Sequence, residues 1–381
     1  MNIKVIKSRG NLYDLKAYGD SVLEVYLKNE GPELGVFLYD TKKNVLTDLD
    51  SVIKGYSFLP VYKCFNTADF AYFADYEQIS SETIRIRIRQ LEGTKAETVC
   101  TFEETADILT SDAYIKVFAL SPDHFLIQTE TVLQDNADRL MGNIKFQLRL
   151  YYKGTDTFED VKDQNLLNNG IASIISVSEN LICIKTGYSS LEDHRLLGRD
   201  EKDALIESIF LGPVSRFIAD LSLGSATQGF THLSSEYYSK NILRPKCRGD
   251  YIFYSVIDYN NLTSDTFFYN YKTEKTITFK RDDIDLSDLY FAYVIKNVPY
   301  IRVVDDTGST QFINLLTTEI DGAFDEEEFR GIHGRNFIFT GVRNHKDHLR
   351  IYRMPKWNLI YDCPGTYQGG CRVGEDFYIY I

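Results

Sequence analysis

Proline, tryptophan and long apolar runs are scarce in this chain of 381 residues. With only 8 prolines, the sequence lacks the composition of a disordered linker. No stretch approaches the ~18 consecutive apolar residues of a membrane-spanning helix, and alanine-rich amphipathic stretches are nearly absent. The segment from Met1 to Lys7 contains no apolar core and no small-residue cleavage site. If the sequence begins at the true N-terminus, we therefore expect a cytoplasmic protein.

Basic residues are outnumbered by acidic ones. The chain contains 42 Lys and Arg residues and 55 Asp and Glu residues, which gives a net charge of −13 at pH 7. A surface of this sign is repelled by phosphate backbones and anionic lipids, so we expect neither nucleic acid nor membrane as a partner. Two explanations of the acidity stay open. It keeps a large β protein soluble, or it attracts cationic ligands and basic protein partners.

The cysteines show no spacing that is typical of metal or redox sites. No CxxC pair occurs among them, which argues against zinc binding and thioredoxin-like chemistry. Cys183 follows Ile182 in an apolar run, where a small buried thiol is the ordinary interpretation. We expect reduced, mostly buried thiols in a reducing compartment. The six positions are Cys64, Cys100, Cys183, Cys247, Cys363 and Cys371.

Aromatic residues, in contrast, are abundant, with 27 Tyr and 24 Phe. Together with Ile and Val they suit the half-buried faces of β-sheets. Seven times, an apolar strand runs through a tight polar turn into a second strand, as in Val36–Leu46 and Phe267–Ile277. The turns lie near residues 40, 92, 154, 212, 272, 316 and 354, and their spacing of roughly 52 is typical of propeller blades.

A second hairpin precedes each of these seven, as in Lys16–Leu23 and Val117–Ile127. Two consecutive hairpins make a four-stranded antiparallel sheet with strands A to D, which is one propeller blade. The segment Cys371–Ile381 repeats the A–B pattern of Cys247–Tyr254, and Ile3–Lys7 is a spare strand. Because a closed ring leaves no exposed sheet edge, we predict that both termini complete one composite blade. This gives eight blades, with seven as the alternative.

The repeat resembles the β-propeller superfamily, and the resemblance extends over nearly the whole chain of 381 residues. We predict a single all-β propeller domain, residues 1–381, of seven complete four-stranded antiparallel repeats and the composite blade. The Trp-Asp ending of WD40 repeats is missing, because the one tryptophan is Trp357, and Gly369-Gly370 is the only glycine pair of the kind found in kelch repeats. The resemblance implies a ligand or partner site on one face or in the central channel, and it transfers no functional residue.

Three connections exceed the length of a hairpin turn. Residues 129–143 and 186–207 each lie between strands B and C, and residues 220–245 are expected to link two blades. Asp200 is a suitable N-cap for a short helix in the second connection. Long loops on a rigid scaffold commonly carry binding residues. The candidate binding residues, all in B–C connections, are Asp135, Arg139, His194, Arg195, His345 and His348.

The histidine motifs each have a functional and a structural interpretation. His345 and His348, with Asp347 between them, suit a divalent metal if further ligands converge on them, and otherwise belong to a solvated loop. His194 is flanked by Asp193 and Arg195, which suits acid–base catalysis if a partner orients the ring. The alternative is that this triplet lies on the surface of a helical insertion.

Three arginines on one strand face are the remaining candidate. Arg85, Arg87 and Arg89 alternate with isoleucines, so the period of two places all three on the same face. They suit an anionic ligand through bidentate contacts. The structural interpretation, which we favour, pairs them with acids of a neighbouring blade such as Glu103 or Glu104.

No catalytic residue, metal site or cofactor is predicted, because phosphate-binding and nucleophile motifs are absent from the sequence. We expect a monomeric binding or scaffold module with a small-molecule, glycan or protein partner on the face that carries the B–C loops. The alternative is a propeller-type carbohydrate-active enzyme, a glycan hydrolase or lyase, which would use paired carboxylates and the abundant tyrosines.

Overall fold

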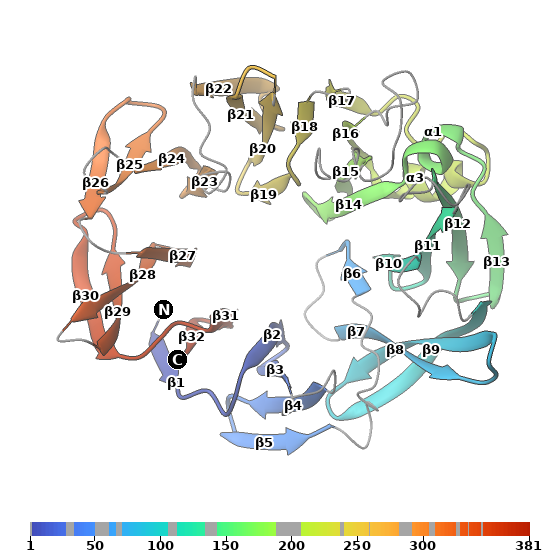
Figure 1. The fold of residues 1–381 in the computed structure, drawn as a ribbon, viewed down its shortest axis with the longest axis horizontal. Coiled ribbons are helices and arrows are strands. Elements are labelled where there is room, and N and C mark those ends of the chain that lie inside the picture. The colour runs from blue at the N-terminus through green and yellow to red at the C-terminus, as the bar shows by residue number, and fades with distance from the viewer. Residues whose placement is uncertain are drawn as a thin grey trace, which may run out of the picture.

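The computed structural model of the chain describes residues 2–27, 34–49, 61–65, 71–105, 113–133, 143–187, 207–236, 240–258, 260–281, 292–304, 309–324, 328–333, 335–343 and 346–381. Its strands form eight sheets that follow one another around a ring (Figure 1). The eight-bladed, all-β propeller that the repeat predicted is therefore confirmed. Within the described residues, no helix is long and apolar enough to cross a membrane.

The first four blades come from the N-terminal half of the chain. Blade one contains β2 (Leu12–Tyr18), β3 (Ser21–Leu27), β4 (Leu34–Asp40) and β5 (Val45–Asp48). Blade two contains β7 (Ala71–Gln78), β8 (Thr83–Glu92) and β9 (Lys95–Thr105). Blade three contains β10 (Ala113–Ser121), β11 (His124–Leu133), β12 (Asn143–Tyr152) and β13 (Thr157–Asp160). Blade four contains β14 (Ile171–Ser176), β15 (Leu181–Thr186), β16 (Glu207–Pro213) and β17 (Thr231–Glu236).

The C-terminal half supplies the other blades. Blade five contains β18 (Lys240–Ile242), β19 (Lys246–Arg248), β20 (Tyr251–Asp258), β21 (Thr263–Asn270) and β22 (Lys275–Arg281). Blade six contains β23 (Ala292–Ile295), β24 (Val298–Val304), β25 (Thr310–Asn314) and β26 (Ile320–Phe324). Blade seven contains β27 (Glu328–His333), β28 (Asn336–Arg343), β29 (Lys346–Arg353) and β30 (Asn358–Pro364). Blade eight contains β31 (Gly369–Val373), β32 (Asp376–Tyr380) and β1 (Ile3–Ile6).

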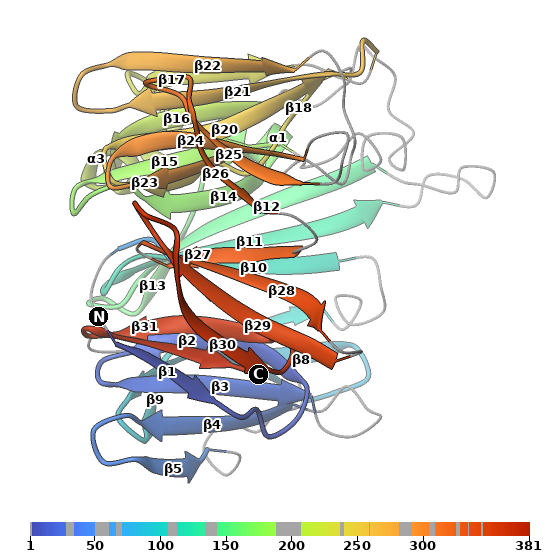
Figure 2. The same ribbon diagram turned by 90° about the vertical axis from the view of Figure 1, so that its left-hand side faces the viewer.

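Seen from the side, the sheets of the blades lie one above another (Figure 2). The hydrophobic core lies between neighbouring blades, because each sheet buries one set of alternating residues on either side. In β8, Ile84, Ile86 and Ile88 are buried against blade three while the arginines between them face the other way. This alternation with a period of two is what the sequence pattern predicted. Each blade is therefore stable only in contact with its neighbours, as expected for a repeat architecture.

Both ends of the chain meet in blade eight, as predicted (Figure 1). Strand β1 pairs with β32 in parallel, with Ile3 opposite Phe377. A buried carboxylate fastens this blade to blade one. Glu24 on β3 accepts hydrogen bonds from the hydroxyls of Tyr26, at 2.8 Å, and Tyr380, at 2.7 Å. Ring closure thus combines a backbone ladder with a buried side-chain network.

Two details differ from the sequence prediction. The sheet of blade two has three described strands instead of the expected four, and strand β6 (Val61–Lys63), which precedes β7 in the chain, pairs in parallel with β10 of blade three, where Val61 packs into the core between these blades. The segment 220–245 is more than an interblade link. It contains the end of helix α3 (Val214–Leu221), a turn, β17 as the outer strand of blade four, and β18. The short helix expected near Asp200 lies outside the described residues.

Candidate functional site

Charged residues are buried at the roots of the two long B–C connections. Strand β11 ends at Leu133 and β12 begins at Asn143, while β15 ends at Thr186 and β16 begins at Glu207. Both connections therefore join strands B and C, as predicted. The strand ends next to them carry Glu130, Lys185 and Glu207, which are buried in otherwise apolar interfaces. Buried charges require partners. Each of these charges is paired with a residue on the neighbouring strand of its own blade, and hydrogen bonds connect both pairs to the next blade.

The first ion pair lies between blades three and four. Lys116 on β10 and Glu130 on β11 are joined by an Nζ–Oε1 distance of 2.5 Å, and the Glu130 side chain is 8% exposed. Gln128, two residues before Glu130 and therefore on the same face of β11, donates to the same carboxylate oxygen at 2.7 Å. These two donors fix the orientation of the Glu130 carboxylate.

Gln128 also fixes the start of blade four. Its buried amide accepts from the Ile171 N–H at 2.7 Å and donates to the Ile171 carbonyl at 3.1 Å, as a neighbouring strand would. The preceding Gly170 has φ +67°, and a Cβ there would lie 2.4 Å from the ring of Phe146. Only glycine satisfies both the left-handed backbone and this close approach. The position of β14 relative to Glu130 is therefore rigidly set.

The second ion pair lies between blades four and five. Lys185 and Glu207 are 3.3 Å apart between Nζ and Oε1, and their side chains are 0% and 1% exposed. Glu207 also accepts from Asn241 Nδ2 at 3.0 Å and from the Ile242 N–H at 2.5 Å. Burial lowers the pKa of Lys185, Glu207 opposes this shift, and the positive charges of Arg244 and Lys116 add to the lowering. The two ion pairs thus belong to one electrostatic cluster.

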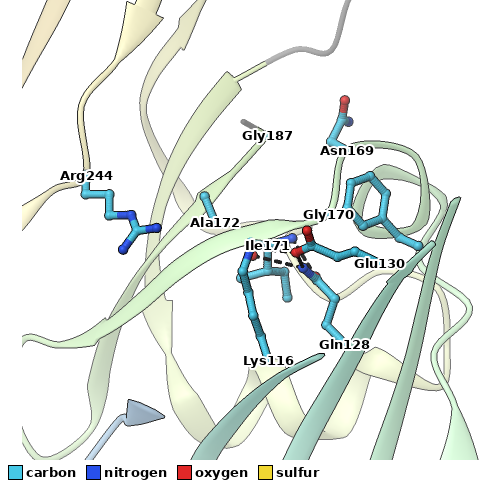
Figure 3. A pocket seen from close by; sticks show the side chains of 10 residues that line it. Lys116, Gln128, Glu130, Asn169, Gly170, Ile171, Ala172, Gly187 and Arg244 are labelled. Atoms are coloured by element: carbon cyan, nitrogen blue, oxygen red, sulfur yellow. Dashed lines mark hydrogen bonds and ion pairs between the residues drawn. The ribbon is translucent and has the colours of Figure 1, made fainter. Parts of the chain in front are cut away.

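A small pocket opens at this cluster (Figure 3). Its volume is about 40 Å³, and Lys116, Gln128 and Glu130 enter it beside Ile171 while Arg244 reaches toward it from the link between β18 and β19. The Arg244 side chain is exposed, and no carboxylate of the described residues forms an ion pair with it. A space of this size accommodates a water or a group such as a carboxylate.

Among the described residues, the charges of the cluster do not balance. Three cations, on Lys116, Lys185 and Arg244, are accompanied by the carboxylates of Glu130 and Glu207. Nearby polar atoms also have unused hydrogen-bonding capacity. In the part of the chain that the structure describes, Thr186 Oγ1 and Asn241 Oδ1 are buried without a partner. Chemically, this arrangement suits the binding of an anionic group by a preformed guanidinium and ammonium.

Of the six predicted binding residues, only His348 lies within the described residues. It stands on β29 of blade seven, where its Nδ1 is 2.9 Å from Asp362 Oδ1 on β30. Arg350 Nε lies 3.7 Å from the other oxygen of this carboxylate. His348 is therefore part of an ion-pair group between strands C and D, apart from the pocket of blades three to five. Outside the described residues lie Asp135, Arg139, His194, Arg195 and His345.

The three arginines of β8 form ion pairs within the protein, which supports their structural interpretation. Arg87 Nε is 2.6 Å from Asp75 Oδ1, and Arg89 Nη1 is 3.3 Å from the other oxygen of Asp75. Arg85 pairs with Glu103 at 3.1 Å. These acids stand on β7 and β9 of the same blade rather than on a neighbour as expected. Glu104 instead pairs with Arg149 of blade three, across the interface. The stripe strengthens blade two and is not a free basic surface.

Sequence reasoning missed the buried charged residues of the cluster beside the pocket. Lys185 follows the run Ile182-Cys183-Ile184, and Glu207 precedes Ile209, so both look like polar strand ends. A charge within one or two residues of a strongly apolar strand was the available signal. It did not reveal that the neighbouring blade covers these positions, because that depends on the packing of β18 and β14.

Solved structures resemble this chain in fold. A mutant puromycin hydrolase complexed with PGG is 7% identical over 94% of this chain and 55% of that chain, with a TM-score of 0.50. The dihydro-heme d1 dehydrogenase NirN in complex with DHE is 10% identical over 94% of this chain and 67% of that one, also at 0.50. An oligogalacturonate lyase in complex with manganese is 9% identical over 91% and 90%, at 0.47.

These similarities concern the propeller scaffold. The chain spans about half the length of the puromycin hydrolase. No protein-family model matches the sequence, and no curated protein matches it. The puromycin hydrolase and the dehydrogenase share the scaffold but differ in name and chemistry, so the scaffold does not specify one chemistry.

Proposed function

We propose that this protein is a binding module that holds a small ligand by its carboxylate on the face carrying the B–C loops. The observation that carries the proposal is the surplus of positive charge in the pocket between blades three and five. The pocket lies at the roots of the two longest B–C connections, and Gly187, the first residue after β15, lines it directly. Loops that leave the rim of a pocket commonly complete a binding site.

The electrostatics favour an anion. The whole chain carries a net charge of −13 at pH 7, so the local excess of cations at the pocket contrasts with the charge of the chain as a whole. A carboxylate 4 Å from a guanidinium gains about 4 kcal/mol at an effective dielectric constant near 20. Glu130 and Gln128 hold Lys116 and the start of β14 in place before any ligand arrives. Such preorganisation lowers the entropy lost on binding.

Calorimetric titration with acetate, citrate, galacturonate and inorganic phosphate tests this proposal. We expect a carboxylate to bind, and Arg244→Ala to weaken its affinity about 10-fold or more, since a hydrogen bond to a charged group contributes about 1.5–3 kcal/mol. The matched control is Arg372→Ala, which removes an exposed arginine next to the A–B turn of blade eight, at the opposite end of the strands. Failure of all four anions to bind, or equal weakening in both variants, would contradict the proposal.

The alternative, a carbohydrate-active enzyme of the hydrolase or lyase type, has one feature in its favour. Glu130 is a carboxylate that lines the pocket beside the ammonium of Lys116. In such an enzyme, Glu130→Gln abolishes turnover, whereas in a binding module it changes affinity only. Incubation with neutral and acidic oligosaccharides, followed by chromatography of the products, distinguishes the enzyme from the binding module.

We also propose a cytoplasmic location and a monomeric state. Light scattering during size-exclusion chromatography tests the monomeric state.

A further inference from the structure

A second and larger cavity opens among the innermost strands of blades four to seven. Its volume is about 460 Å³, which lies within the range of about 300–1,000 Å³ that small-molecule pockets occupy. Residues of β14, β19, β23 and β27 line it, and Figure 1 shows these strands at the inner ends of their blades. The cavity shares no lining residue with the pocket of Figure 3. It is a separate site.

One wall of this cavity is cationic. Lys246 and Arg248 are two residues apart on β19, so both side chains leave the same face of the strand. Both are exposed to solvent in the cavity, yet the protein packed around them removes part of their hydration and thereby lowers the pKa of each. No Asp or Glu occurs among the described residues that line the cavity. Partly dehydrated cations of this kind favour an incoming anion.

The remaining walls are apolar and aromatic. Ile175 and Phe253 contribute from blades four and five, Tyr293 from blade six and Ile332 from blade seven. The Tyr293 ring is held by an edge contact with Phe329, at 5.3 Å between centroids. Burial raises the pKa of Tyr293 to about 12, so its hydroxyl stays protonated at neutral pH. A fixed ring and branched side chains suit a flat apolar group.

We propose that this cavity binds a small organic anion with a flat apolar body, such as an aromatic carboxylate or sulfonate. The anionic group pairs with Lys246 and Arg248, and the apolar body packs against Tyr293 and Ile332. Binding removes apolar surface from water and places the anionic group beside the guanidinium of Arg248 and the ammonium of Lys246. The proposal does not depend on the anion pocket at Arg244, because the lining residues of the two sites differ.

Fluorescence titration with 8-anilinonaphthalene-1-sulfonate tests it on the whole chain. This probe combines an aromatic body with a sulfonate and brightens in apolar surroundings. We expect saturable binding, at least tenfold weaker binding in the Lys246→Ala/Arg248→Ala variant, and unchanged binding in Arg372→Ala. We also expect 2-naphthoate to compete with the probe, and the uncharged 2-naphthamide to compete at least tenfold less well.

Several results would overturn the proposal. These are the absence of saturable binding to the folded protein, equal affinity in the Lys246→Ala/Arg248→Ala variant, equal weakening by Arg372→Ala, and equal competition by the amide. Thermal unfolding monitors whether each variant is folded. If the double variant fails to fold, Ser176→Phe replaces it, because Ser176 lines the cavity and a phenyl group fills the space without altering charge. Probe binding at the original affinity in that variant would exclude this cavity as the site.

Discussion

The buried pair Lys185–Glu207 allows a double-mutant cycle with a defined outcome. Both side chains are fully buried between blades four and five. Removing one partner of a buried ion pair costs about 3–5 kcal/mol, because an uncompensated charge is left behind. After Lys185→Met, Glu207 still accepts from Asn241 and from the Ile242 N–H. We therefore expect the lower end, about 3 kcal/mol, in the free energy of unfolding.

Glu207→Gln is expected to cost a similar amount, about 3 kcal/mol, because Lys185 loses its counter-charge while its side chain is fully buried. The double variant Lys185→Met/Glu207→Gln removes both charges and keeps an amide oxygen for the Ile242 N–H. Apolar or neutral replacement of a whole buried pair is often nearly neutral. We expect the double variant to lie within about 1 kcal/mol of the original protein, which gives a coupling energy of about 5 kcal/mol or more.

Guanidinium unfolding measures these free energies, and the chain offers a natural probe in its one tryptophan, Trp357 in blade seven. Far-UV circular dichroism follows the sheets as a whole, so coincident transitions establish a common unfolding event. If the two single losses simply add in the double variant, the coupling is zero. The charges at the root of the long connections would then not stabilise each other, and the electrostatic account of the cluster would fail.

Three further outcomes follow from the packing. Burial and the hydrogen bond to Glu24 raise the pKa of Tyr26 to about 12. The unfolded chain therefore loses this proton at lower pH than the folded protein, and the free energy of unfolding falls by up to about 2–3 kcal/mol between pH ~10 and 12. Tyr26→Phe should flatten the pH dependence of unfolding in this range. Gly170→Ala should destabilise by several kcal/mol, because the new Cβ meets an aromatic ring at 2.4 Å, whereas Gly93→Ala, also at positive φ but in open space, costs about 1–2 kcal/mol in thermal melts. Asp75→Asn should cost about 3 kcal/mol in denaturant unfolding, since this buried carboxylate serves two arginines, and the exposed Glu77→Gln less than about 1.

The ring itself could be predicted because its information is repetitive. Each blade has the same sequence pattern of apolar strand and polar turn. The segments Cys371–Ile381 and Ile3–Lys7 provided the hairpin and the strand of the eighth blade. Strand β6 could not be placed this way. Val61–Lys63 has the same apolar character whether it joins blade two or blade three, and only packing against β10 decides the outcome.

The candidate pocket was less predictable than the fold. Sequence reasoning selected polar residues within the two long B–C connections, whereas the described pocket and the charged cluster beside it are built from the strands next to these connections. Gln128 and Ile171 are 43 residues apart, and Glu207 and Asn241 are 34 apart. Nothing local in the sequence marks these partners. Their pairing follows from how neighbouring blades dock, which no single strand encodes.

The composite blade has a consequence for how the protein is made. Lys4 and Tyr378, which pair across β1 and β32, are 374 residues apart in sequence. The N-terminal strand therefore waits, without its final partner, until translation has delivered every other blade. Joining sites so distant carries a loop-closure entropy that only a nearly assembled ring reduces. A chain that lacks β32 leaves faces of blades one and seven uncovered, and exposed apolar surface of this kind favours aggregation. The pairing of β1 with β32 thus makes closure of the ring depend on two segments that are far apart in sequence.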